Sequence, residues 1–144
     1  MSRIGFGTYR ASIKSKEHYD ALKYALESGC EVIDTSSNYT HGDSEALIGK
    51  VIDETKIKPL IITKVGYIQG ETLENFNDKF QEDLVVINET LKHSIHPSFI
   101  ANQLDQSLER LNVDCIDVYL LHNPEYYLKT KNADKTEYYA RIQK

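Results

Sequence analysis

The stretch Leu60-Ile61-Ile62-Thr63-Lys64-Val65 (LIITKV) decides the fold class of this chain. Apolar residues occupy both of its faces, which is typical of a parallel strand that is covered on both sides. A lysine stands near its carboxyl end, and a charged side chain at the end of an apolar strand is costly to keep unless something uses it. The stretch therefore predicts a buried parallel strand with a functional residue at its end.

Strand-like and helix-like segments alternate along the chain on both sides of this stretch. Apolar spacing predicts strands at residues 4–8, 31–35 and 115–122, with helices over residues 15–27 and from residue 43 to about residue 52. A third helix begins at Pro97, has its apolar stripe at Ile100, Leu104, Leu108 and Leu111, and is followed by part of a fourth over residues 125–144. This βαβαβαβ order predicts an α/β fold with a parallel sheet and right-handed crossovers.

Residues 67–95 interrupt the alternation. The segment is polar and is expected to be irregular, apart from a short extra strand at residues 84–88. His93 and His96 near its end are interpreted as polar loop residues. Such a long loop is unusual and is often a lid or a binding element.

Polar side chains stand at or just after the ends of the predicted strands. Asp34 is near the end of EVIDT (31–35), Tyr39 follows it by five residues, Lys64 ends LIITK, and His122 ends IDVYLLH (116–122). Neighbouring parallel strands are about 4.8 Å apart, and in α/β folds the carboxyl edge of the sheet is where chemistry is done. We therefore expect these four side chains to converge on one small site.

The four residue types indicate a division of labour. A tyrosine has a pKa of about 10 and is a poor acid at neutral pH, but an adjacent lysine ammonium favours the phenolate and lowers that pKa. Asp34 would keep Lys64 charged and oriented, and His122 can donate a hydrogen bond to a substrate oxygen. Tyr39 so tuned can protonate a developing alkoxide.

Composition excludes several other classes of protein. The 144 residues suit one domain, and the formal net charge of −5 favours neither nucleic acid nor an anionic membrane. No apolar run approaches the ~20 residues of a membrane span, and the N-terminal residues lack a signal-peptide stretch, so the cytoplasm is the expected location. The spacing of Cys and His residues predicts no metal site. Residues 5–10 fail the dinucleotide fingerprint, because Arg10 occupies the place of the third glycine.

At these residues the chain resembles the aldo-keto reductase family. The stretches that carry the resemblance are IGFGTYR (4–10), VIDTSSNYTHGDSEALIGKVI (32–52), LIITKVGY (60–67) and SLERLNVDCIDVYLLHNPE (107–125). The resemblance implies a (β/α)8 TIM barrel, an oxidoreductase that uses NADPH, and an aldehyde or ketone as the small-molecule substrate. It also implies a catalytic tetrad made of Asp34, Tyr39, Lys64 and His122. The positions expected to contact NADP are Gly7, Thr8, Asp34 and Asn123.

The chain also departs from that pattern, because a barrel of this type needs about 250 residues or more. Residues 1–144 are therefore expected to form a single domain, an incomplete half-barrel of four strands that ends within the fourth helix. Three hypotheses stay open. In the first, the chain reduces carbonyls with Tyr39 as the proton donor, in a form impaired by truncation. In the second, it is a non-catalytic fragment that acts through protein binding or through self-association at exposed sheet edges. In the third, it is a weak nucleotide-binding domain with no turnover.

Overall fold

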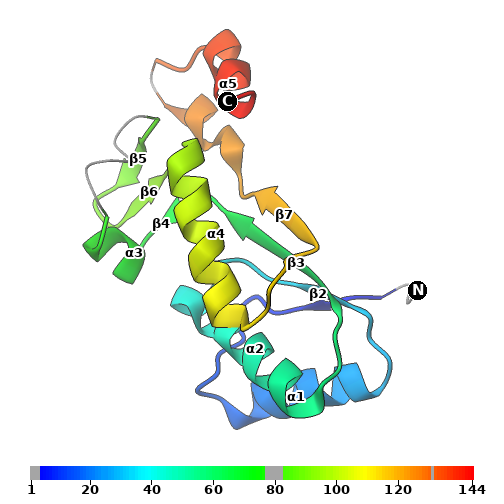
Figure 1. The fold of residues 1–144 in the computed structure, drawn as a ribbon. Coiled ribbons are helices and arrows are strands. Elements are labelled where there is room, and N and C mark those ends of the chain that lie inside the picture. Colours follow the sequence, from blue (N-terminus) through cyan, green and yellow to red (C-terminus); the bar gives the residue numbers. More distant parts are fainter. Residues whose placement is uncertain (1–3, 77–82, 131) are drawn as a thin grey trace.

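Four parallel strands form the central sheet of the computed structural model, which describes residues 4–76, 83–130 and 132–144. Their order is β1 (Phe6–Gly7), β2 (Val32–Asp34), β3 (Leu60–Val65) and β7 (Val118–Leu121). Helix α1 (Lys16–Glu27) connects β1 to β2, α2 (Asp43–Thr55) connects β2 to β3, and α4 (Pro97–Leu111) precedes β7 (Figure 1). The predicted α/β alternation and parallel sheet are confirmed.

The strand β3 has the predicted bounds, whereas β1, β2 and β7 are shorter than the apolar runs that predicted them. The run 115–122 gives a strand only from Val118, because the side chain of Asp117 accepts the hydrogen bond of the Ile61 N–H at 2.8 Å. The pairing of β3 with β7 then begins at Ile62 and Val118. A carboxylate thus takes one place in the ladder that a backbone carbonyl would otherwise hold.

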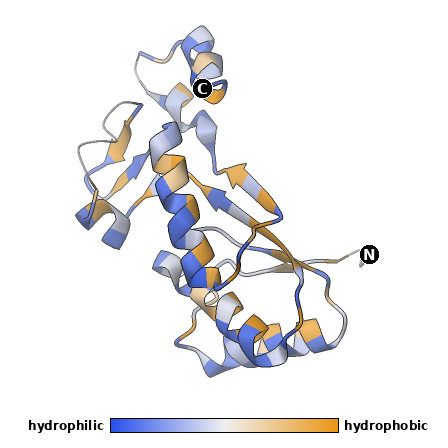
Figure 2. Cartoon of the chain, in the orientation of Figure 1, coloured by the Kyte–Doolittle hydropathy of each residue, from blue (hydrophilic) through white to orange (hydrophobic). Residues whose placement is uncertain are grey.

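One face of the central sheet packs against the helices and forms the core. Ile33 and Ile61 lie in a cluster with residues of α1 and α2, and Val65 lies in a second cluster with Phe99 of α4. Burying one such side chain contributes about 1.5–3 kcal/mol. The apolar residues follow the strands and the contact faces of the helices (Figure 2). The members of the first cluster are Leu22, Leu26, Ile33, Leu47, Ile48, Val51, Ile52, Ile61 and Leu111.

The opposite face of the sheet, here called the inner face, has no comparable cover within the described residues. The strand register places Val32 beside Leu60 and Ile62 beside Val118 on this face. None of these side chains belongs to either core cluster, and Leu120 of the same face is 43% exposed. The sequence predicted cover on both faces of β3, but the described helices cover only one.

Helices α2 and α4 meet at close range. A Cβ atom on Gly49 would lie 2.6 Å from the carbonyl oxygen of Arg110, so only glycine fits there. Glu45 is fully buried; its Oε2 accepts a hydrogen bond from Arg110 Nε at 2.8 Å, and its Oε1 accepts one from Thr63 Oγ1 at 2.7 Å. This buried carboxylate joins α2, α4 and β3 at one point.

The predicted apolar stripe of α4 is only partly its buried face. The buried side chains are Phe99, Gln103, Ser107 and Leu111, whereas Ile100, Leu104 and Leu108 are half-buried. The helix is therefore turned by about one residue from the orientation that its leucines indicated, because its C-terminal turn packs on Gly49 of α2.

The segment 67–95 is more regular than predicted. It contains β4 (Tyr67–Ile68), helix α3 (Glu71–Glu74), β5 (Val85–Asn88) and β6 (Leu91–His93), while residues 77–82 lie outside the described part. The strands pair antiparallel in the order β4-β6-β5. The short strand predicted at 84–88 is confirmed as β5. The other two strands of this sheet, β4 and β6, were not predicted.

The C-terminal segment also differs from the single helix predicted for it. A 3-10 helix, η3 (Pro124–Lys129), precedes α5 (Lys135–Ile142), and residue 131 between them is not described. The side chain of Asp134 begins α5 by accepting the Glu137 N–H. Arg141 is 5% exposed and binds the side chain of Asp83 at 3.6 Å, which ties α5 to the second sheet. Of the helices described, none is both long and apolar enough to cross a membrane.

Candidate active site

Asp34, Lys64 and Tyr39 come together at the carboxyl edge of the central sheet. Lys64 Nζ is 2.7 Å from Asp34 Oδ1 and 3.5 Å from the hydroxyl oxygen of Tyr39. It also donates to the carbonyl oxygen of Thr35 at 2.7 Å. The side chain of Lys64 is 15% exposed and that of Asp34 is 44% exposed. An ion pair this open to solvent is worth at most about 1 kcal/mol, so its main effect is to fix the direction of the ammonium group.

The parallel register explains why these groups meet. Asp34 is paired with Ile62, and Lys64 is paired with Leu120, so both charged side chains stand on the inner face. Tyr39 opens a short 3-10 turn, η1 (Tyr39–Gly42), that follows β2. The loop before it is tied to β3 because the Ser37 N–H donates to the carbonyl oxygen of Lys64 at 3.1 Å.

His122 lies beside Tyr39 at the same edge. The two rings meet edge to face with their centroids 5.9 Å apart. The His122 N–H continues the β3–β7 ladder by donating to the carbonyl oxygen of Val65 at 2.8 Å, and its Nδ1 is 2.9 Å from Ser36 Oγ. The structure therefore brings together all four side chains that the sequence placed at strand ends.

A second layer of side chains supports His122, and it comes from the segment that the sequence left irregular. His93 is 1% exposed, and its Nε2 is 2.6 Å from the carbonyl oxygen of His122. Gly66 leaves room for this contact, since a Cβ there would lie 2.4 Å from His93 Nε2. The interpretation of His93 as a polar loop residue was wrong, because β4 and β6 bury it.

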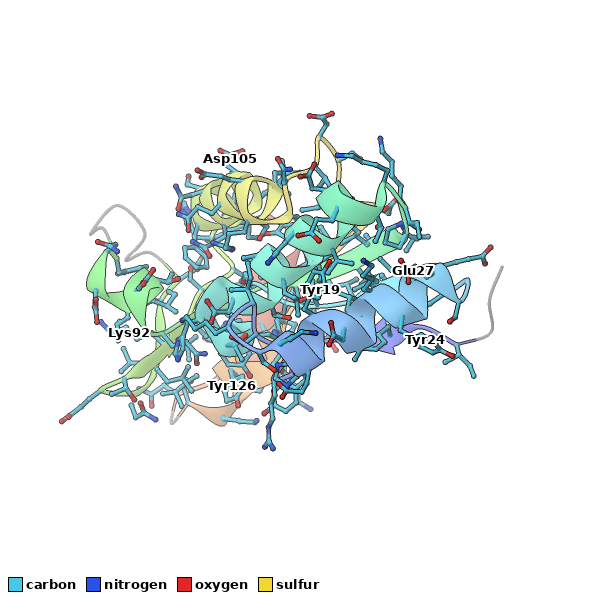
Figure 3. The ribbon with its side chains drawn as sticks, turned by 90° about the horizontal axis from the view of Figure 1, so that it is seen from below. Tyr19, Tyr24, Glu27, Lys92, Asp105 and Tyr126 are labelled. Carbon is cyan, nitrogen blue, oxygen red and sulfur yellow. The ribbon has the colours of Figure 1, made fainter. Side chains whose placement is uncertain are left out.

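Tyr67 also packs against the ring of His122. Its ring centroid lies 4.8 Å from that of His122 and 5.7 Å from that of Tyr126. Tyr126 belongs to the η3 segment and is labelled in Figure 3. Burial, followed by a hydrogen bond with Tyr126, raises the pKa of Tyr67. The phenol therefore stays protonated, and it donates to Asn123 Oδ1 at 3.0 Å.

A cavity of about 470 Å³ opens beside Tyr39 and His122. A larger hollow of about 610 Å³ lies between α3, α4 and η1, and it shares the wall formed by Asn38, His41, Tyr67 and Gln69. The smaller cavity is the candidate site, because Tyr39 and His122 of the predicted tetrad line it. Its aromatic lining consists of Tyr9, Tyr39, His41, Tyr67, His122 and Tyr126.

The residues expected to contact a cofactor occupy different environments. Gly7 is paired with Asp34 on the inner face, and a Cβ built on it meets nothing within 4 Å, so there is free space beside Asp34. Thr8 is fully buried, and its Oγ1 donates to the carbonyl oxygen of Asp34 at 3.1 Å. Asn123 is half-buried with both ends of its amide engaged, by Tyr67 and by Glu125. Of the four positions, Gly7 and Asp34 are the two that border open space.

Stability is expected to fall as the pH is lowered from about 7 to about 4. Burial, followed by the charge of Lys64, lowers the pKa of His122 to about 4. An unfolded histidine binds a proton near pH 6.5, so the unfolded state holds more protons within this window and gains stability there. The slope is at most about 1.4 kcal/mol per pH unit, and the partial exposure of the ring makes it smaller.

The measurement is the urea midpoint as a function of pH for the unmodified chain and for His122→Asn. The variant should lose part of the pH dependence, whereas His18→Asn, which replaces an exposed imidazole at the start of α1, should keep it. Equal pH dependence in all three proteins would contradict the assignment to His122.

The sequence predicted the four side chains that meet at the candidate site, but it missed the residues that support them. Nothing in a single sequence marks His93 or Tyr67, since their partners are far away in the chain. Ser36 carries a weak signal, because it follows a strand end in the same way as Asp34 and Tyr39. His41, Asp43 and Glu45 do not gather as metal ligands, and no group of three or more His, Cys, Asp or Glu side chains does so in the described ranges.

Comparison with known proteins shows which family the chain is similar to. The model of the Aldo/keto reductase family matches residues 3–142. The NADH-specific methylglyoxal reductase of Escherichia coli is 26% identical over 131 residues, which are 85% of this chain and 38% of that protein. Among solved structures, the holo form of the aldo-keto reductase AKR11C1 from Bacillus halodurans superposes with a TM-score of 0.66 and 26% identity, over 84% of this chain and 36% of that one.

An aldo-keto reductase of Bombyx mori, solved in complex with NADP, is also similar, with 25% identity and a TM-score of 0.55 over 86% of this chain and 35% of that one. The chain thus spans well under half the length of the relatives it matches, and its parallel sheet is a part of their (β/α)8 barrel. The family model covers nearly the whole chain, and its solved members share the fold. This chain belongs to the aldo/keto reductase family.

Proposed function

We propose that this chain carries the catalytic groups for the NADPH-dependent reduction of an aldehyde or ketone, with Tyr39 as the proton donor. The observation that supports it most is the position of Lys64 Nζ, 2.7 Å from Asp34 Oδ1 and 3.5 Å from the Tyr39 hydroxyl. A phenol, an ammonium and a carboxylate in line at the carboxyl edge of a parallel sheet form a proton-delivering site.

Each group has a part in the proposed reaction. When bound, a reduced nicotinamide supplies a hydride to the carbonyl carbon. Tyr39 gives its proton to the carbonyl oxygen, which completes the alcohol and leaves a phenolate. Lys64 stabilises the negative charge that develops on the phenol oxygen, and Asp34 holds Lys64 in place. His122, which lines the same cavity beside Tyr39, orients the carbonyl oxygen.

The space beside Gly7 is where we propose that a nicotinamide cofactor lies. It borders Asp34 on the inner face and is not filled by any protein atom within 4 Å of a Cβ built there. The relatives named above include one described as NADH-specific and one solved with NADP. We propose NADP for this chain, with Gly7 and Asp34 as the nearest contacts and with Asn123 and Thr8 holding the strand ends that frame the site.

NADPH is expected to bind this chain weakly. The strands described here supply the catalytic edge, but they are only part of the barrel of the relatives, and the contacts that hold the rest of a dinucleotide are few. Titration of nicotinamide fluorescence measures the affinity. Gly7→Val should weaken binding further by filling the free space, while Ala21→Val on the exposed surface of α1 should not. Equal affinity in both variants would place the cofactor elsewhere.

A non-catalytic role is the second candidate, and the bare inner face favours it. We propose that a second copy of this chain covers that face. Val32, Leu60, Ile62 and Val118 form an apolar strip outside both core clusters. Within the described residues, β1 and β7 also each pair along one side only. Unpaired edge strands beside an apolar face favour association with another sheet. The central sheet of a second copy has strands of the same length and direction as those of the first.

Sedimentation velocity at micromolar concentration tests this association. The unmodified chain is expected to sediment as a dimer, and Val118→Asp is expected to sediment as a monomer because it puts a charge on the apolar strip. Tyr24→Glu is the control, since Tyr24 is an exposed side chain of α1 and lies outside the apolar strip (Figure 3). A compact monomer in the unmodified chain would exclude the second copy.

A further inference from the structure

The hydroxyl of Ser36 has one proton and three acceptors within reach. Its Oγ lies 2.7 Å from the side-chain oxygen of Asn38, 2.9 Å from His122 Nδ1 and 3.2 Å from the carbonyl oxygen of Lys64. Ser36 is fully buried, so water does not supply a further partner. Whichever acceptor takes the proton therefore decides how the other hydrogen bonds of this group are arranged.

Two of these groups, the carbonyl oxygen of Lys64 and the amide of Asn38, do not need the proton of Ser36 to form a hydrogen bond. The carbonyl oxygen of Lys64 already accepts from the Ser37 N–H at 3.1 Å and from Ser37 Oγ at 3.0 Å. The amide of Asn38 can turn by half a rotation and present its NH₂ group to Ser36 Oγ at the same position. His122 Nδ1 has Ser36 as its one partner among the described residues, so it either accepts the proton of Ser36 or donates its own proton to Ser36 Oγ.

The imidazole of His122 is uncharged at neutral pH, since burial and the charge of Lys64 lower its pKa to about 4. It then carries one proton, on Nδ1 or on Nε2, and the partner of Nδ1 selects which. We propose that Asn38 donates to Ser36, that Ser36 donates to His122 Nδ1, and that this relay fixes the proton of His122 on Nε2. Ser36 and Asn38 are thus positioning residues that act through His122.

The direction of this relay decides what His122 offers to the cavity beside Tyr39. With the proton on Nε2, the imidazole donates a hydrogen bond, as the carbonyl oxygen of a substrate requires. With the relay reversed, Nε2 is a bare acceptor and repels the same oxygen. This consequence rests on the proposed function, whereas the position of the proton does not and can be measured without cofactor or substrate.

Nitrogen-15 NMR of the histidine side chains tests the relay directly. The chain has five histidines, and His122→Asn identifies the resonances of His122 by their loss. In mildly alkaline buffer, Nδ1 of His122 is expected to resonate as an unprotonated, pyridine-type nitrogen and Nε2 as a protonated, pyrrole-type nitrogen. The opposite pattern in the unmodified chain overturns the proposal.

Asn38→Asp is the decisive variant, because a carboxylate only accepts hydrogen bonds and has nearly the same shape as the amide. It should take the proton of Ser36 and move the proton of His122 to Nδ1. Ser37→Ala is the matched control, since this neighbouring hydroxyl binds the carbonyl oxygen of Lys64 and makes no bond to His122. An unchanged His122 pattern in Asn38→Asp, or a reversed one in Ser37→Ala, overturns the relay.

Turnover, measured separately, distinguishes the relay that sets the tautomer of His122 from the role of His122 in carbonyl reduction. If the chain reduces carbonyls, Asn38→Asp should lower kcat and leave NADPH affinity within about twofold of that of the unmodified chain. A reversed imidazole with unchanged kcat would overturn the role of His122 as a donor to substrate while leaving the relay intact. A correct tautomer in a chain without turnover would count against the proposed function alone.

Discussion

Replacing Tyr39 with phenylalanine is expected to lower the rate of carbonyl reduction by about 10²–10⁴-fold, the usual contribution of a positioned proton donor. The variant removes the hydroxyl that lies 3.5 Å from Lys64 Nζ. It keeps the ring, which packs edge to face with Tyr9 at 5.2 Å and with His122 at 5.9 Å. Because those contacts survive, NADPH affinity and stability should change little, and the loss should appear in kcat.

The measurement is NADPH oxidation at 340 nm with a panel of aldehydes and ketones, together with the fluorescence titration. Tyr9→Phe is the matched control, since it removes a phenolic hydroxyl from the same cavity at a side chain that is 68% exposed. Retained turnover in Tyr39→Phe contradicts its role as the proton donor. Binding of NADPH without turnover in the unmodified chain favours the non-catalytic candidate.

Replacing Arg110 with alanine is expected to destabilise the fold by about 3–5 kcal/mol, because it leaves a buried carboxylate without its counter-charge. Glu45 is fully buried, and Arg110 approaches its Oε2 with Nη2 at 2.7 Å and with Nε at 2.8 Å. After the substitution, Thr63 is the one remaining hydrogen-bond donor to Glu45 among the described residues. A single hydroxyl does not offset the desolvation of a charge.

Urea unfolding followed by circular dichroism measures this effect. The double variant Glu45→Leu/Arg110→Met should recover most of the lost stability, since exchanging both partners of a buried pair for apolar groups is often neutral. Lys16→Ala, which breaks an exposed pair with Asp20, should cost no more than about 0.5 kcal/mol. A similarly small loss in Arg110→Ala would show that water reaches Glu45 and replaces the guanidinium.

Much of the fold could be predicted from the sequence because the patterns that indicate its strands and helices are local. The apolar run Leu60–Val65 and the helical spacing around Leu22 and Leu47 each depend on residues within two turns or one strand. The four side chains of the candidate site were found for the same reason, since a polar residue at the end of an apolar strand stands out within its own segment. Parallel topology then brings the ends of β2, β3 and β7 to one edge, whatever the loops do.

The segment 67–95 shows where that reasoning stops. Its strands are short, and β4 pairs with β6, about 25 residues later, so neither partner marks the other in the sequence. His93 read as a loop residue for this reason, although pairing buries it against the carbonyl oxygen of His122. The orientation of α4 was missed in the same way, because Gly49 of α2 decides it.

The sequence by itself thus determined the order of the elements and which side chains meet at the candidate site, because both follow from short-range patterns of apolar and polar residues. Only the tertiary structure decided which face of the sheet the helices cover, which side chains support His122, and which partner Ser36 meets. Those outcomes depend on contacts such as Ser36 with His122, whose members are 86 residues apart and come together through the register of the sheet. Register is a property of paired strands, and no single strand contains it.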